Sequence, residues 1–184
     1  MVKLLLLDFD GTVADTRRAN ALAYIDALRE EGYELDEETY NRRYFGMRCH
    51  EFLSNIGFAS REDRERIRRR KIELYPTHFD TVAINRPLIS FVRNFRRYAG
   101  KVYIVSTGHI DNITNVMRHL GICGDFDRII SGDDVSRPKP DPECFLSAMR
   151  MAGAEPSQTI VFEDSEIGLE AARRSGAAVV KIEF

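Results

Sequence analysis

Two carboxylates near the start of the chain have the type and spacing for acid–base or metal chemistry. Asp8 and Asp10 directly follow the apolar run Leu4–Leu7 in the stretch LLLLDFDGT. Side chains two positions apart on an extended chain point the same way. Carboxylates that close repel each other unless a proton or a cation separates them. The alternative is that one aspartate is only a turn residue, with Gly11 allowing the tight turn and Thr12 capping it.

Two later segments supply groups that suit an anion. Ser106, Thr107 and Gly108 follow the apolar run KVYIV, and hydroxyl and backbone N–H groups near the start of a helix can bind an anion. Lys139 lies between Pro138 and Pro140 in RPKPDP, and its ammonium group could neutralise a phosphate. These groups complement the acidic residues and indicate a phosphate-bearing ligand.

A second acidic pair follows another apolar run. Glu163 and Asp164 come directly after TIVF. Carboxylate oxygens without histidine or cysteine suit Mg²⁺ better than zinc. The sequence therefore favours magnesium as the cofactor.

Short, continuously apolar runs predict the strands that must position these groups, because strands of a parallel sheet are buried on both faces. The runs are Lys3–Leu7, Lys101–Val105, Arg128–Ile130, Thr159–Phe162 and Ala178–Ile182. Helical patterns separate them over Pro87–Tyr98, Ile110–Leu120, Pro142–Met151 and Ile167–Ser175. This alternation predicts an α/β fold, a Rossmann-like three-layer core with a parallel sheet. Ligands bind such sheets beyond the carboxyl ends of the strands, which is where the polar groups stand.

Residues 16–80 interrupt the alternation and contain no segment that resembles a buried strand. Arg17–Gly32 has a helical apolar stripe, and Arg61–Tyr75 is a strongly charged helix expected to be exposed. Its charge run Arg61–Lys71 is interpreted as a solvated helix face. We therefore expect an α/β core of residues 1–15 and 81–184, with an all-helical insertion of residues 16–80.

Composition limits the classes of partner and the location. The chain has 184 residues, 43% of them hydrophobic, and a net charge of −2, without the basic surface of a nucleic-acid-binding protein. No apolar run has the length of a membrane span. Cys49, Cys123 and Cys144 form neither a metal-binding pair nor a disulfide framework. A cytoplasmic monomer with a small-molecule partner, and no nucleic acid or membrane partner, is the expectation.

Four segments, in order, resemble the motifs of the haloacid dehalogenase superfamily. They are DFDGTVADT, VSTG, RPKPDPECF and VFEDSEIGLEAARRSG, and the resemblance covers nearly the whole chain. It implies a parallel α/β core with an inserted cap. The helical insertion directly after the first motif is similar to that of the subgroup containing phosphoglycolate phosphatases and β-phosphoglucomutases.

The resemblance implies a Mg²⁺-dependent phosphatase that hydrolyses a small phosphorylated metabolite through an aspartyl-phosphate intermediate. Asp8 would be the nucleophile, which splits one difficult step into two. Asp10 would protonate the leaving oxygen and later activate water, and its backbone carbonyl would help to hold the metal. Asp164 would bind the metal together with Asp8, and Glu163 would support it directly or through water.

The resemblance also assigns the anion-binding groups. Ser106 would donate a hydrogen bond to a phosphoryl oxygen, Thr107 and Gly108 would shape the loop at the substrate, and Lys139 would offset negative charge. Each has a structural alternative: Ser106 as a helix N-cap, Lys139 as a solvated loop residue, and Glu163 as a structural carboxylate.

The cap is expected to select the substrate. The segment Gly46–Leu53 resembles the cap loop of this subgroup, which makes Arg48 and His50 the candidate specificity residues. Further candidates are Arg17, Arg18 and Arg43. Alternatively, arginines of this region pair with nearby acids; this applies most to Arg42 and Arg43, with Glu37, Glu38 and Glu51 as partners.

Two other functions are alternatives. A sugar phosphomutase of the β-phosphoglucomutase type would share both core and cap, but those enzymes have a histidine at the cap hinge, where this chain has Asn20. A non-catalytic binding protein would have lost at least one motif, and all four are present.

Overall fold

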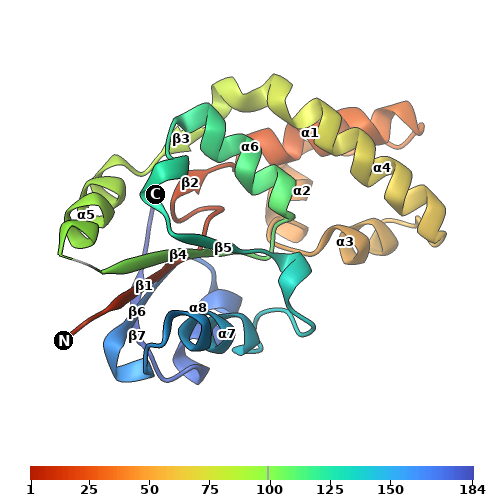
Figure 1. Ribbon diagram of the computed structural model, residues 1–184. Coiled ribbons are helices and arrows are strands. Elements are labelled where there is room, and N and C mark those ends of the chain that lie inside the picture. Colours follow the sequence, from red (N-terminus) through yellow and green to blue (C-terminus); the bar gives the residue numbers. More distant parts are fainter. Residues whose placement is uncertain (99) are drawn as a thin grey trace. The chain divides into compact units, whose positions relative to one another are not determined.

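The computed structural model describes residues 1–98 and 100–184, and the chain divides into two compact units (Figure 1). The first unit comprises Met1–Asp15 and Ile84–Phe184, and the second comprises Thr16–Ala83. Each unit has a cluster of buried apolar residues of its own. No described helix is both long enough and apolar enough to cross a membrane.

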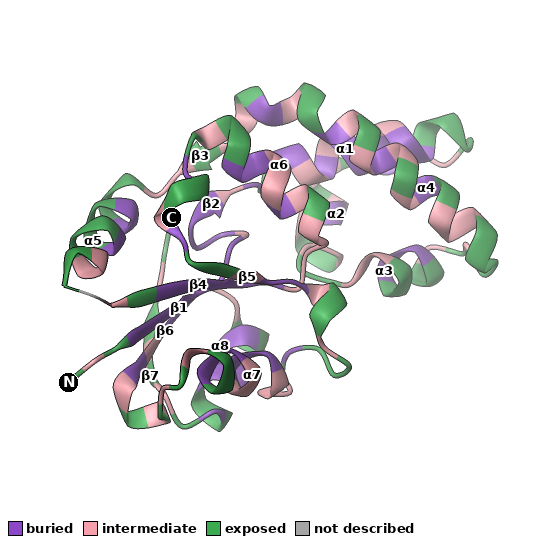
Figure 2. Cartoon of the chain, viewed as in Figure 1, coloured by how far each residue is buried: buried purple, intermediate pink, exposed green. Residues whose placement is uncertain are grey.

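The first unit is built on a sheet of five parallel strands in the order β5-β4-β1-β6-β7. The strands are β1 (Leu4–Leu7), β4 (Lys101–Val105), β5 (Arg128–Ile130), β6 (Thr159–Glu163) and β7 (Ala178–Lys181). β1 is the central strand, and its four leucines are fully buried, as Figure 2 shows for the middle of the sheet. The predicted parallel α/β fold is confirmed.

Helices cover both faces of this sheet (Figure 1). On one face lie α5 (Arg86–Arg97) and α6 (Ile110–Leu120), and on the other lie α7 (Glu143–Ala152) and α8 (Glu166–Arg174). Each turns its apolar stripe inward, and Gly121 ends α6 in the left-handed conformation. The predicted boundaries of these helices agree with the structure to within one residue.

Short elements complete the connections. Three short 3₁₀ helices are η2 (Cys123–Asp125), η3 (Gly132–Asp134) and η4 (Pro156–Gln158). β2 (Ala14–Asp15) and β3 (Ala83–Ile84) form a separate two-stranded sheet where the chain leaves and re-enters the first unit.

The second unit is helical, with α1 (Arg17–Glu30), α2 (Glu37–Arg43), α3 (Cys49–Asn55), α4 (Arg61–Leu74) and the 3₁₀ helix η1 (Tyr75–Thr81). Aromatic rings pack between its helices. The ring of Tyr24 lies 4.9 Å from that of Phe52 and 5.5 Å from that of Tyr40. These contacts tie α1, α2 and α3 together.

Two local predictions in this unit are wrong. The expected loop Gly46–Leu53 is helical from Cys49 onward, because α3 begins there. Lys71, assigned to a solvated face, is buried. It lies four residues after the buried Ile67, on the face of α4 that packs inward. Its Nζ donates a hydrogen bond to Oδ1 of Asn20 at 2.7 Å, which satisfies the buried ammonium.

Candidate active site

Three carboxylates come together at the carboxyl edge of the sheet. Asp8 follows β1, Glu163 ends β6, and Asp164 is the next residue. Leu7 pairs with Phe162 in the parallel register, so Asp8 and Glu163 occupy equivalent positions on neighbouring strands. One oxygen of each of the three carboxylates lies within 4.8 Å of the others.

Lys139 is the cation at the centre of this cluster. Its Nζ donates hydrogen bonds to Oδ1 of Asp8 at 2.7 Å and to Oε2 of Glu163 at 2.6 Å. A third bond goes to the carbonyl oxygen of Val105 at 3.2 Å. The side chain is only 3% exposed, so the alternative of a solvated loop lysine is wrong. The chain spends this lysine on holding two buried carboxylates together.

The balance of charge in the cluster is negative. Burial raises the pKa of Asp8 well above its usual value, and the charge of Glu163 raises it further against the opposing effect of Lys139. Burial and Glu163 also raise the pKa of Asp164. Burial alone would lower the pKa of Lys139, but the carboxylates of Asp8 and Glu163 outweigh it and raise that pKa. One ammonium therefore serves three carboxylates, which leaves the cluster short of positive charge.

A divalent cation would correct this shortage, and the donor set fits one. The cluster offers carboxylate oxygens alone, and hard oxygen ligands are those of Mg²⁺ rather than of zinc or copper. Among the described residues, the side chains of this group are those of Asp8, Glu163 and Asp164, and the side chain of Asp10 is outside it.

The loop after β1 is held against Asp164. Oγ1 of Thr12 donates a hydrogen bond to Oδ1 of Asp164 at 3.0 Å, a contact across 152 positions of sequence. Gly11 has φ +96°, and a Cβ there would overlap the carboxylate of Asp164. Glycine is therefore required at this position both by the turn and by the close approach. The sequence predicted a turn-shaping role for Gly11 and Thr12 but not their contact with the second acidic pair.

Two residues that support the site were missed by sequence reasoning. Asn85 donates from its side chain to the carbonyl of Thr12 at 3.2 Å and from its backbone to that of Val13 at 3.0 Å. Ser165 donates from its hydroxyl to Oε1 of Glu163 at 2.8 Å, so this carboxylate is held on both oxygens. Their positions as N-caps of α5 and α8 are visible in the sequence, but their partners are not.

Ser106 and Gly108 lie at the same edge, after the neighbouring strand β4. Ser106 is buried, and its Oγ accepts a hydrogen bond from the backbone N–H of Gly108 at 3.0 Å. The alternative of Ser106 as a helix N-cap is wrong, because α6 begins at Ile110 and His109 caps it. A Cβ on Gly108 would lie 3.4 Å from Oδ2 of Asp10, so the backbone of this loop approaches that carboxylate. Thr107, between them, is half-buried.

The candidate specificity residues belong to the second unit and make contacts within it. Nε2 of His50 lies 3.0 Å from Oε1 of Glu65. Arg48 is half-buried and directly precedes α3. The other arginines include Arg42 at 3.7 Å from Glu38, Arg18 at 3.8 Å from Glu37, and Arg17 at 5.0 Å from the ring centroid of Phe45. Arg43 is exposed. Their part in selecting a substrate stays a prediction.

Comparison with known proteins places the chain among related enzymes. The profile of the family described as haloacid dehalogenase-like hydrolase matches residues 5–182. The chain is 31% identical over 183 residues to a validoxylamine A 7'-phosphate phosphatase from Streptomyces hygroscopicus subsp. limoneus, which covers 96% of this chain and 83% of that protein. It is 25% identical over 191 residues to a β-phosphoglucomutase from Bacillus subtilis (strain 168), which covers 98% of this chain and 83% of that protein.

Among solved structures, the fold is similar to that of CbbY from Rhodobacter sphaeroides in complex with phosphate. The TM-score is 0.90 at 23% sequence identity, over 100% of this chain and 87% of that one. At this identity the likeness concerns the fold.

Proposed function

Because the chain belongs to the haloacid dehalogenase-like hydrolase family, we propose that it is a Mg²⁺-dependent phosphatase of a small phosphorylated metabolite. The observation that carries the proposal is the buried contact of Lys139 with Asp8 and Glu163, beside Asp164. This arrangement holds the carboxylate of Asp8 in a fixed place at the edge where parallel sheets bind ligands. The relative named as a validoxylamine A 7'-phosphate phosphatase supports a small phosphate ester as the substrate class.

In the proposed reaction, an oxygen of Asp8 attacks the phosphorus of the ester, and the bond from phosphorus to the leaving oxygen breaks. Asp10 donates its proton to that oxygen, so the leaving group departs as an alcohol. The product of this step is an aspartyl phosphate on Asp8. Asp10, now a carboxylate, takes a proton from a water molecule whose oxygen attacks the phosphorus. Inorganic phosphate leaves, and Asp8 and Asp10 return to their starting states.

The remaining groups of the site stabilise charge. Lys139 would offset the charge that gathers on Asp8 and the phosphoryl group, and Ser106 with the N–H groups around Gly108 would bind phosphoryl oxygens. Asp8, Asp164 and the backbone carbonyl of Asp10 would hold Mg²⁺, with Glu163 supporting it. When bound, Mg²⁺ supplies positive charge that lets an anionic nucleophile approach an anionic phosphate.

A sugar phosphomutase of the β-phosphoglucomutase type is the second candidate, and the 25% identity to the Bacillus subtilis enzyme favours it. Such an enzyme must keep its phosphoenzyme away from water until a sugar phosphate reorients. Asn20 stands at the position that resembles the hinge histidine, and its amide donates to the Tyr75 hydroxyl at 3.1 Å. An amide cannot titrate, so nothing at this position would delay the activation of water by Asp10. A hydrolase therefore remains the better proposal.

The test follows both products from a panel of phosphate esters that includes β-glucose 1-phosphate and p-nitrophenyl phosphate. We expect inorganic phosphate to accumulate with Mg²⁺ and to stop with a chelator. Asp8→Asn should abolish release while it leaves the melting temperature close to that of the wild type, and the surface variant Asp111→Asn should keep full activity. Formation of glucose 6-phosphate with little free phosphate would replace the phosphatase by the mutase.

We further propose that the second unit, residues 16–83, serves as the cap that selects the substrate, with Arg48 and His50 as the specificity residues. The contact of His50 with Glu65 would orient its ring. A monomeric state and a cytoplasmic location complete the proposal. Size-exclusion chromatography with light scattering tests the first, and fractionation of the source cells tests the second.

A further inference from the structure

A hollow on the α5–α6 face of the first unit lies apart from the acidic strand ends. It has a volume of about 480 Å³, which is in the range of small-molecule sites. Its lining comprises Ile84, Arg86, Ile89, Ser90, Arg93, Asn94, Arg97, His119, Leu120 and Ile122. None of these residues belongs to the proposed catalytic cluster, so a ligand here would leave that cluster free.

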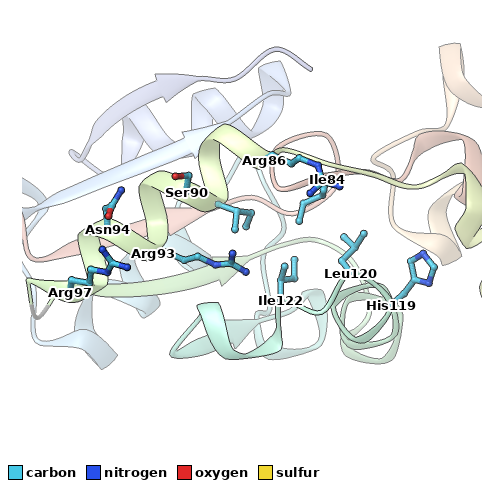
Figure 3. A pocket seen from close by; sticks show the side chains of 10 residues that line it. Ile84, Arg86, Ser90, Arg93, Asn94, Arg97, His119, Leu120 and Ile122 are labelled. Carbon is cyan, nitrogen blue, oxygen red and sulfur yellow. The ribbon is translucent and has the colours of Figure 1, made fainter.

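The cationic wall of the hollow comes from one helix (Figure 3). Arg93 and Arg97 follow Arg86 by seven and eleven residues, which is close to two and three helical turns, so the three side chains share one face of α5. Ser90 and Asn94 lie between them and add neutral hydrogen-bonding groups. This face therefore presents positive charge and polar groups to the same space.

Two of these arginines retain their charge for a ligand. Arg93 binds Asp125 through two hydrogen bonds of 2.8 and 2.9 Å, and is neutralised by it. Within residues 1–98 and 100–184, the structure records no ion pair for Arg86 or Arg97. The hollow thus carries uncompensated positive charge in a chain whose net charge is −2, and would attract anions.

The rest of the wall is apolar. Ile89 and Ile122 are 4% and 1% exposed and close the hollow from the side of the core, together with Leu120 from the end of α6. Figure 3 shows Leu120 and Ile122 on the segment that faces α5. A solvated ion alone would leave this apolar wall without a contact, so the ligand must have an apolar body as well as a charge.

We propose that this hollow is a non-catalytic binding site for a small organic anion, with a carboxylate, sulfonate or phosphate group at Arg86 and Arg97 and an apolar body against Ile89, Leu120 and Ile122. The charge determines where the ligand enters, and the apolar contact holds it. Because the arginines are exposed, each contributes modestly and its contribution is screened by salt.

The test titrates the protein with naphthalene-1-sulfonate, an anion with an apolar body that lacks a phosphoryl group. Amide NMR shifts locate the binding, and the dissociation constant comes from the same titration. We expect shifts over Arg86–Arg97 and around Ile122, whereas the amides of Ser106–Gly108 stay unchanged. Inorganic sulfate and the neutral 1-naphthalenemethanol should each bind more weakly than the sulfonate, because each has only one of the two features.

Three variants complete the design. Arg86→Ala and Arg97→Ala should each weaken sulfonate binding by about threefold. Arg173→Ala, which removes an exposed arginine from α8, should bind as the wild type does. Circular dichroism melts establish that all three fold. The proposal is overturned if the shifts map to Ser106–Gly108 instead of α5, if no shifts occur, or if Arg86→Ala and Arg97→Ala bind with the wild-type constant.

Discussion

Among individual residues, Lys139 connects the most distant parts of the site. Its ammonium joins Asp8, 131 positions earlier, to Glu163, 24 positions later, in a buried environment. Desolvating such a group is expensive unless hydrogen bonds and opposite charges compensate it. Here three acceptors do so, which makes the lysine a structural requirement of the carboxylate cluster as well as a proposed participant in catalysis.

Removal of this ammonium should therefore destabilise the fold. We expect Lys139→Met to lower the free energy of unfolding by about 3 kcal/mol in the presence of a chelator, because two buried carboxylates lose their cation. Thermal and urea unfolding measure the change. Lys181→Met is the control: its lysine is half exposed and lies 3.1 Å from Glu166, and an exposed pair contributes about 1 kcal/mol or less. Equal losses in the two variants would contradict the interpretation.

The carboxylates themselves should bind Mg²⁺ in a way that does not depend on turnover. A ligand that binds only the folded state stabilises it by about 2.7 kcal/mol at one hundred times its dissociation constant. We expect the melting temperature to rise with Mg²⁺ in the wild type and in Asp111→Asn, and to respond much less in Asp164→Asn. An unchanged response in Asp164→Asn would remove Asp164 from the metal site.

Among the helices and strands, the contact between α8 and the end of β6 determines how Glu163 is held. Ser165 caps α8 by accepting a hydrogen bond from the N–H of Gly168 at 3.2 Å, and it also donates to Glu163. Gly168, in the first turn of α8, lies so close to the carboxyl group of Glu163 that a Cβ would overlap it. The helix thus approaches the strand end at a distance that only glycine permits.

Gly168→Ala should displace Glu163 from Lys139. Alanine favours a helix over glycine by about 1 kcal/mol, but the overlap with a buried carboxylate should outweigh this and destabilise the protein by about 1–3 kcal/mol. Phosphate release should fall in the same variant. Gly124→Ala is the matched control, because open space surrounds the position of its Cβ. A Gly168→Ala protein that is as stable and as active as Gly124→Ala would show that this contact is unimportant.

For the molecule as a whole, the division into two units separates two kinds of residue. The first unit holds every residue proposed to act on the phosphoryl group, and the second holds the candidates for substrate selection. Each unit packs its own apolar cluster, one around the sheet and one around the aromatic rings of the helical unit. Sequence changes in the second unit can therefore alter selectivity without disturbing the packing of the catalytic cluster.

Arg48→Ala tests this division of labour. We expect it to reduce kcat/KM for the preferred metabolite ester several times more than for p-nitrophenyl phosphate, because the phosphoryl group is common to both and the leaving group is not. Arg42→Ala, which removes an exposed arginine 3.7 Å from Glu38, should leave the order of substrates unchanged. A uniform loss across the panel would instead give Arg48 a structural role.

The strand ends illustrate how far the amino-acid pattern reaches. Short apolar runs that alternate with helical segments predict a parallel sheet, and a parallel sheet gathers the ends of its strands at one edge. This reasoning brings Asp8, Ser106 and Glu163 to one edge without knowledge of any contact. It also locates the helices of the first unit to within a residue, because their apolar stripes must face the sheet.

Only the tertiary structure decided the contacts within that edge. The burial of Lys139, the bond from Thr12 to Asp164, the support from Asn85 and Ser165, and the overlap that demands Gly168 depend on segments far apart in sequence. The same holds for Lys71, which a charged helix buries against Asn20. Periodicity specifies which face of an element is buried, whereas the partner of each polar group is set by packing between elements, where buried donors and acceptors must be satisfied.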